Sequence, residues 1–147
     1  YVFVLGKEGK PSTRVTQRLE WEQAVGMMSP PLYYWWKDHV REKIKRIGAT
    51  IENYQRDGYY AVGCGAAAKG ISMVNMARVK LDVIVDNTPT KWNQETSGMQ
   101  ILPFDAISEM KQDKILFVIL AWNVGAEIRR NILALRDNRN DVFMETR

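Results

Sequence analysis

The sequence predicts an α/β fold in which a parallel sheet with flanking helices is preceded by a helical linker segment. From residue 59 onward, short runs of β-branched and aromatic residues alternate with stretches of helical periodicity. One of these runs, Lys114–Ala121, is apolar, as expected for a strand buried on both faces of a parallel sheet. Before residue 58, in contrast, apolar residues recur every three or four positions, which is typical of helices.

The composition limits the possible classes of protein. A chain of 147 residues is long enough for one ordinary domain, and 46% hydrophobic with 26% charged residues excludes a disordered chain. The net charge of +4 suits a phosphate-bearing ligand but is too small for a nucleic-acid binder. A single cysteine and a single histidine exclude an internal disulfide framework and a zinc site. The longest apolar run, Ile115–Trp122, is too short to span a membrane, and because no secretory signal is visible we expect a cytoplasmic protein.

Residues 1–57 are predicted to connect an upstream domain to the sheet. The chain opens without methionine on an apolar run, Tyr1–Leu5, which is typical of a strand entered midway, so we expect a piece of a longer protein. Arg14–Val25 has the pattern of a short amphipathic helix. A longer helix is predicted to begin at Ser29–Pro30, with the serine as N-cap, and to end at Asp57–Gly58.

Residues 58–147 are predicted to form the sheet domain. The predicted strands are Tyr59–Cys64, Leu81–Val85, Met99–Leu102, Lys114–Ala121 and Asp141–Met144. The predicted helices are Ala66–Ala77, Phe104–Met110 and Val124–Arg136. Strands that alternate with helices require right-handed crossovers, so the pattern predicts a Rossmann-like sheet. In such sheets, ligands bind at the carboxyl ends of the strands.

The segment after the first sheet strand is a candidate anion site. Gly63 and Gly65 can take positive φ and allow a ligand to approach, while Ala66 and Ala67 leave the first amides of the helix uncovered for a phosphate. Lys69 opposes the helix dipole, at a cost of about 0.3–1 kcal/mol, unless a bound anion reverses the balance. The alternative is a tight turn with a solvent-exposed lysine. A Walker loop is excluded because the lysine does not directly follow the second glycine.

Two other strand ends carry candidate residues. Asp86 and Asn87 follow the glycines by about twenty residues, where dinucleotide-binding folds place the acid that holds a ribose. A simple turn explains them equally well, and Ala68 at the third glycine position weakens the fingerprint. Trp122 could stack on a base or a sugar, or belong to the core. Asn123 is predicted to be the N-cap of the last helix.

Together these segments resemble the C-terminal domain of SAM-dependent C-methyltransferases, which methylate a carbon of a nucleotide-activated deoxysugar. The matching motifs, in the order and spacing of that family, are Val62–Gly70, Val85–Lys91 and Leu120–Asn123 with Glu127–Ile128. The resemblance covers about residues 59–136. It differs in one loop, which keeps Lys91 and Gly98 but lacks the tyrosine and proline usual in the family. This difference leaves the identity of the sugar open.

The resemblance implies a lobe that closes over a sugar nucleotide while an upstream methyltransferase domain binds S-adenosylmethionine. It therefore implies no catalytic residue and no bound cofactor within this chain, which would be inactive alone. In the implied reaction, a base removes the proton next to a sugar ketone, and the resulting enolate takes the methyl group. The residues implied around the substrate are Gly63, Gly65, Ala66, Ala67, Lys69, Asp86, Asn87, Lys91, Trp122 and Asn123.

Two other functions remain open at this point. The Gly-x-Gly turn with Asp86 is also compatible with an NAD-binding oxidoreductase or sensor domain. A noncatalytic interaction module, in which the aromatic-rich long helix docks on a partner, is the third possibility.

Overall fold

The computed structural model describes residues 9–146, which divide into two compact units, one up to Arg41 and one from Glu42 onward. The strand predicted at Tyr1–Leu5 lies outside the described residues. The division predicted at residue 57, between a connecting segment and the sheet domain, stays a prediction.

Two helices form the first part of the chain, as the sequence predicts. Helix α1 spans Thr13–Ala24, and its N-cap is the Ser12 hydroxyl, which accepts a hydrogen bond from the Val15 amide. Helix α2 spans Pro30–Arg56 and ends before Gly58, whose φ is +83°. No side chain of α1 is buried, and Trp35 in α2 is 63% exposed. No helix in the described part of the chain is long and apolar enough to cross a membrane.

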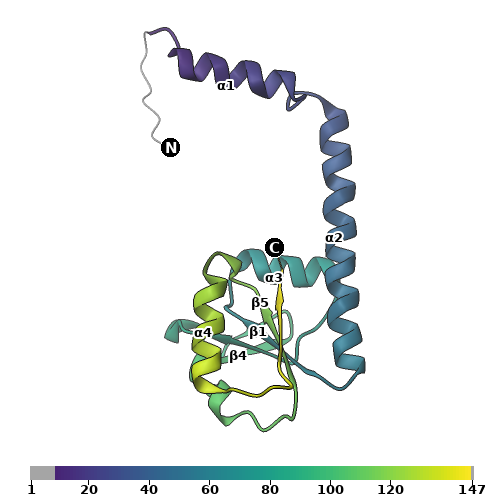
Figure 1. Ribbon diagram of the computed structural model, residues 1–147, viewed down its shortest axis with the longest axis vertical. Coiled ribbons are helices and arrows are strands. Elements are labelled where there is room, and N and C mark those ends of the chain that lie inside the picture. The colour runs from purple at the N-terminus through teal and green to yellow at the C-terminus, as the bar shows by residue number, and fades with distance from the viewer. Residues whose placement is uncertain (1–8, 147) are drawn as a thin grey trace. The chain divides into compact units, whose positions relative to one another are not determined.

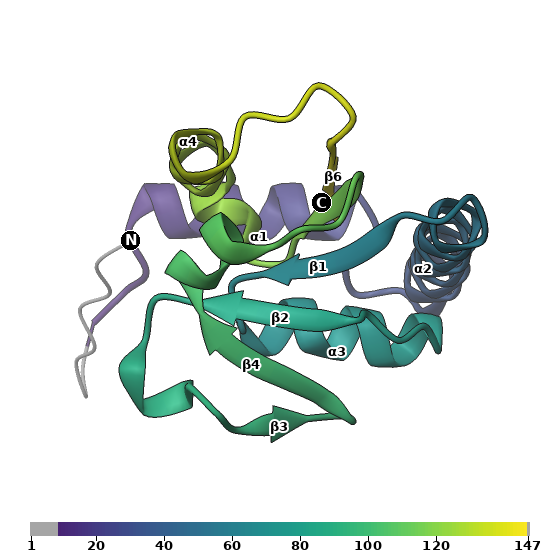
Figure 2. The same ribbon diagram turned by 90° about the horizontal axis from the view of Figure 1, so that it is seen from below.

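The second unit is built on a six-stranded sheet in the order β3-β4-β2-β1-β5-β6 (Figure 2). The strands are β1 (Tyr60–Cys64), β2 (Val83–Asp86), β3 (Glu95–Thr96), β4 (Met99–Pro103), β5 (Ile115–Ile119) and β6 (Val142–Glu145). Every pairing is parallel except the antiparallel pairing of β3 with β4. The predicted α/β fold with a mostly parallel sheet and flanking helices is therefore confirmed.

The sequence did not predict β3. Two residues joined to β4 through Ser97 and Gly98 make this strand, and both turn residues have positive φ, at 52° and 75°. Such a pair matches the tight turn of a two-residue hairpin. A strand of two residues inside a polar loop is too short to show alternation, so its pattern carries no signal.

Helices cover both faces of the sheet. They are α3 (Ala68–Ala77), α4 (Gly125–Leu135) and the short 3₁₀ helices η1 (Pro89–Lys91), η2 (Phe104–Glu109) and η3 (Trp122–Val124). One face packs on Ile47 and Ile51 of α2 together with Val74 of α3. The other face packs on Ile107 of η2 and Ile132 of α4. The predicted helix Phe104–Met110 is thus a single 3₁₀ segment, the conformation typical of such short connections.

The strand order changes direction between β1 and β5. From β1 the chain proceeds outward to β2 and β4 on one side, and then returns to β5 and β6 on the other. Helices α3 and α4, which follow β1 and β5, therefore pack on opposite faces of the sheet (Figure 1). In open sheets of this kind, the loops that diverge at this point frame the ligand-binding crevice.

Candidate functional site

A pocket of about 190 Å³ lies where the strand order reverses. It is framed by the loops after β1, β2 and β5 and by the first turns of α4. The polar groups around it come from Asp86, Asn87, Thr88, Glu127 and Asn131. The pocket therefore occupies the position at which the predicted fold places its ligand.

Gly63 and Gly65 shape the loop after β1 in different ways. Gly65 has the predicted positive φ, at +85°, and its amide donates to the Val85 carbonyl at 2.8 Å. Gly63 lies within β1 and does not use the positive φ that a glycine can adopt. A Cβ at Gly63 would lie 2.8 Å from Leu81 Cδ1 and 2.9 Å from Leu120 Cδ1, so a larger residue would force the ends of these side chains to shift.

A third glycine, Gly70, brings α3 close to the sheet. A Cβ at this position would lie 2.5 Å from the Cβ of Leu120 and 2.6 Å from its carbonyl oxygen. In dinucleotide-binding folds, the last glycine of the fingerprint serves this purpose. The fingerprint spacing in the sequence puts that position at Ala68, two residues before the glycine that makes the contact.

The amides at the start of α3 are partly used by the protein itself. The Ala66 amide donates to Asp86 Oδ2 at 2.6 Å, and the Ala67 amide donates to the Gly65 carbonyl at 2.8 Å. Helix α3 begins at Ala68, after Ala67 as an N-cap with no side-chain hydrogen bond. The amides that lack an acceptor by helix geometry are therefore those of residues 68–70.

Asp86 joins the loops after β1 and β2. Its side chain accepts hydrogen bonds from the Ala66 amide, from the Thr88 amide at 2.8 Å and from Lys91 Nζ at 3.2 Å. Lys91 Nζ also donates to the Ala66 carbonyl at 3.0 Å. Burial by itself would raise the pKa of the Asp86 carboxyl, but these hydrogen bonds outweigh it and hold the pKa below its ordinary value. The carboxylate is thus ionised and already accepts hydrogen bonds from the protein itself.

Lys69, in the first turn of α3, contacts Trp122, the first residue of η3. Its Nζ lies 4.4 Å from the ring centroid of Trp122, within cation–π distance. Lys69 is exposed and Trp122 is half-buried, so the pair lies at the surface. Asn123 does not cap the last helix as predicted, because η3 intervenes and the N-cap of α4 is Val124, which makes no side-chain cap. The inserted 3₁₀ turn moves the start of the helix past the asparagine.

Three residues that line the pocket were not predicted as site residues, namely Thr88, Glu127 and Asn131. Glu127 and Asn131 are four residues apart on α4, so both side chains lie on one helix face. Their four-residue spacing was the signal in the sequence that could have identified Glu127 and Asn131 as a pair. Of the predicted residues, Gly65, Asp86 and Asn87 line the pocket. No structural observation tests the predicted contacts of the candidate residues with a ligand, and these contacts stay predictions.

Comparison with known proteins gives one family. A family model described as the C-methyltransferase C-terminal domain matches residues 2–144 of the 147. No protein of curated function matches the chain.

Proposed function

The chain belongs to the C-methyltransferase C-terminal domain family, and we propose that it holds the nucleotide-activated deoxysugar on which the complete enzyme acts. The single observation that carries this proposal is the pocket at the reversal of strand order, which is lined by side chains from α4 and the loop after β2. A sugar nucleotide has an anionic diphosphate, a flat base and hydroxyl groups. The site offers a group suited to each.

The diphosphate is proposed to bind at the start of α3. The amides of residues 68–70 point along the helix axis at its positive end, and the Lys69 ammonium adds a full charge beside them. Because Lys69 already rests on the Trp122 ring, it is held near the loop instead of extending freely into water. An anion bound here would also compensate for the unfavourable position of a lysine in a first helical turn.

The sugar is proposed to enter the pocket, and the base or the sugar to stack on Trp122, which follows the lining residue Ala121 in the chain but does not line the pocket itself. The carboxylate of Glu127 and the amides of Asn87 and Asn131 are suitable partners for hydroxyl groups at the pocket. Trp122 offers an aromatic face for stacking on the base or the sugar. All these contacts orient the substrate, and in this proposal no residue of this chain moves a proton. Correct orientation by itself can lower the barrier of the methyl transfer by several kcal/mol.

We propose that the methyl donor binds to another part of the complete enzyme. In nucleoside-binding folds, the acid at the end of the second strand holds a ribose. Here that acid is Asp86, which is 6% exposed and already accepts hydrogen bonds from Ala66, Thr88 and Lys91. These contacts support the proposal that S-adenosylmethionine binds elsewhere in the complete enzyme, and they disfavour NAD for the same reason. We therefore propose that the chain alone is inactive.

The test is a calorimetric titration of the chain with dTDP-4-keto-6-deoxyglucose, a nucleotide-activated deoxysugar that carries a ketone. We expect saturable binding that is weakened about two- to fivefold in the Lys69→Ala variant, because an exposed charged contact is lost. Lys45→Ala is the matched control, since it removes the same charge from an exposed position on α2. Absence of binding, or equal binding by the Lys69→Ala variant and the unmodified chain, would overturn the proposed phosphate contact.

A further inference from the structure

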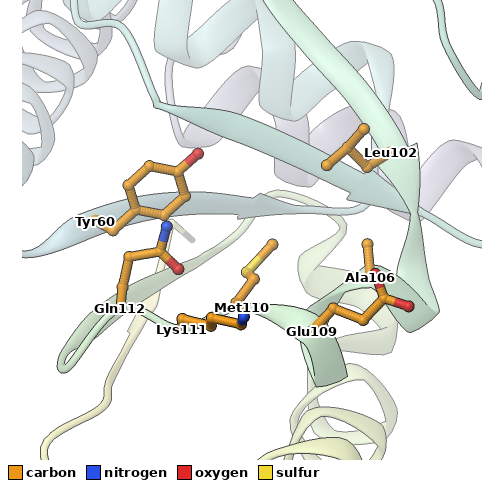
Figure 3. Close-up of a pocket in the computed structure, with 7 residues that line it drawn as sticks. All are labelled: Tyr60, Leu102, Ala106, Glu109, Met110, Lys111 and Gln112. Carbon is orange, nitrogen blue, oxygen red and sulfur yellow. The ribbon is translucent and has the colours of Figure 1, made fainter.

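A second and larger pocket, of about 410 Å³, lies on the sheet face that carries η2 and α4 (Figure 3). Tyr60, the first residue of β1, forms one side, and Gln112, three residues before β5, lies beside it. The first pocket lies instead beyond the last residues of β1 and β2. The second pocket shares no lining residue with the proposed sugar-nucleotide site.

The short crossover from β4 to β5 accounts for this pocket. Such crossovers usually contain an α-helix that covers the sheet, whereas here the segment is the six-residue η2. Phe104 and Ile107 of η2 cover the sheet beside β2, and the segment then leaves the sheet at Met110. The sheet surface around Tyr60 and Leu102 is consequently only partly covered.

The backbone of residues 110–113, which forms one wall of this pocket, is held by hydrogen bonds from residues that follow α4. The Arg136 guanidinium donates to the carbonyls of Met110 and Gln112, and it forms an ion pair with Asp141 at 2.7 Å. The side chains of this pair are 12% and 3% exposed, so the contact is shielded from water. Asn138 donates to the Asp113 carbonyl at 3.0 Å and extends the support. A wall held in this way loses little freedom when a ligand binds.

The lining combines an apolar interior with charges of both signs. Figure 3 shows the Met110 thioether between Tyr60 on one side and Leu102 on the other. Methionine adapts to varied apolar shapes and makes favourable contacts with aromatic rings. Glu109 and Lys111 flank Met110 in the chain, and both are exposed. A carboxylate and an ammonium therefore lie on the same wall of the pocket, formed by the end of η2 and the residues that follow it.

We propose that this pocket binds a free α-amino acid with a large apolar side chain. The side chain would enter between Tyr60, Leu102 and Met110, while Glu109 pairs with the amino group and Lys111 with the carboxylate. A neutral apolar molecule would leave both charges unused, and a singly charged one would leave one of them unused. The volume lies within the range of small-molecule sites. This inference does not depend on the proposed function.

The test uses the chain with ¹³C-labelled methionine methyl groups and L-phenylalanine as the probe. We expect the Met110 methyl signal to shift saturably, while that of Met76, which is 61% exposed on α3, stays in place. Met110→Leu identifies the signal. If the Met110 signal does not respond to L-phenylalanine, the proposal is wrong.

Two analogues then separate the charged contacts. Phenethylamine lacks the carboxylate, and 3-phenylpropionate lacks the amino group. We expect Glu109→Gln to weaken phenethylamine about two- to fivefold and to spare phenylpropionate, whereas Lys111→Gln does the reverse. The matched controls Glu52→Gln and Lys45→Gln remove the same charges from exposed positions on α2. Equal effects of the Glu109 and Lys111 variants on both analogues would show nonspecific apolar binding and overturn the assignment.

Discussion

The substitution Gly70→Ala tests whether close contact between α3 and the sheet positions the loop after β1. The added Cβ would lie 2.5 Å from the Leu120 Cβ and 2.6 Å from its carbonyl oxygen. The backbone of Leu120 fixes the positions of both atoms, so a change of side-chain rotamer cannot relieve the overlap. The start of α3 would have to move away from the sheet.

The expected loss of stability follows from two opposing effects. Overpacking of this kind costs about 3 kcal/mol, the upper part of the usual range, because the neighbouring atoms cannot rotate away. Alanine recovers about 1 kcal/mol as the better helix former. The net loss is therefore about 2 kcal/mol. In urea, with a slope of about 2 kcal/mol/M, the unfolding midpoint should fall by about 1 M.

Gly125→Ala is the control, because Gly125 is also in the first turn of a helix that follows a strand. Its added Cβ would lie 3.3 Å from a methyl carbon of Ile119, a contact that needs an adjustment of only a few tenths of an ångström. We expect this variant to retain nearly the original midpoint. If Gly70→Ala is as stable as Gly125→Ala, the close approach of α3 does not constrain the loop.

Two further substitutions test the ionic contacts. Arg136→Ala leaves the buried Asp141 carboxylate without its partner and should lower the free energy of unfolding by about 3 kcal/mol, whereas the exposed Arg139→Ala should change it by less than about 0.5 kcal/mol. Urea denaturation measures both, and similar losses would refute a structural role for the pair. The lowered pKa of Asp86 means that its ionised form favours the folded state, so this stabilisation is complete above the unfolded pKa of about 3.9 and disappears as the pH falls below the lower folded value. Urea midpoints between pH 6 and 2 should fall more steeply for the unmodified chain than for Asp86→Asn, and parallel profiles would contradict this expectation.

The fold was predictable because its strands are apolar and its helices periodic. Residues 115–119 of β5 are buried throughout, as the run of apolar residues in the sequence predicts. The boundaries of α1 and α2 were also close, because a serine N-cap, a proline and a glycine mark the ends of helices directly. The apolar runs and the residues at helix ends can be recognised because each depends only on residues close together in the sequence.

The site was less predictable because it depends on contacts between segments that are distant in the sequence. The pairing of Asp86 with the Ala66 amide joins residues twenty positions apart, and the approach of Gly70 to Leu120 joins residues fifty apart. Lys69 carries no local sign that it rests on Trp122. The residue types suggested an anion site, but only the fold shows that the Ala66 and Ala67 amides already donate hydrogen bonds within the protein.

The hydrogen bonds between Asp86, Lys91 and Ala66 have a consequence for engineering. Under the proposed function, the loop after β2 is the segment in which changes of substrate preference would be sought. Because Lys91 of that loop also supports the backbone at Ala66, exchanging the whole loop would disturb the segment before α3 as well. Libraries that vary residues 94–96 would test the proposed substrate contacts while retaining Asp86, Lys91 and Trp92, whose Nε1 donates to the Asp86 carbonyl at 2.7 Å.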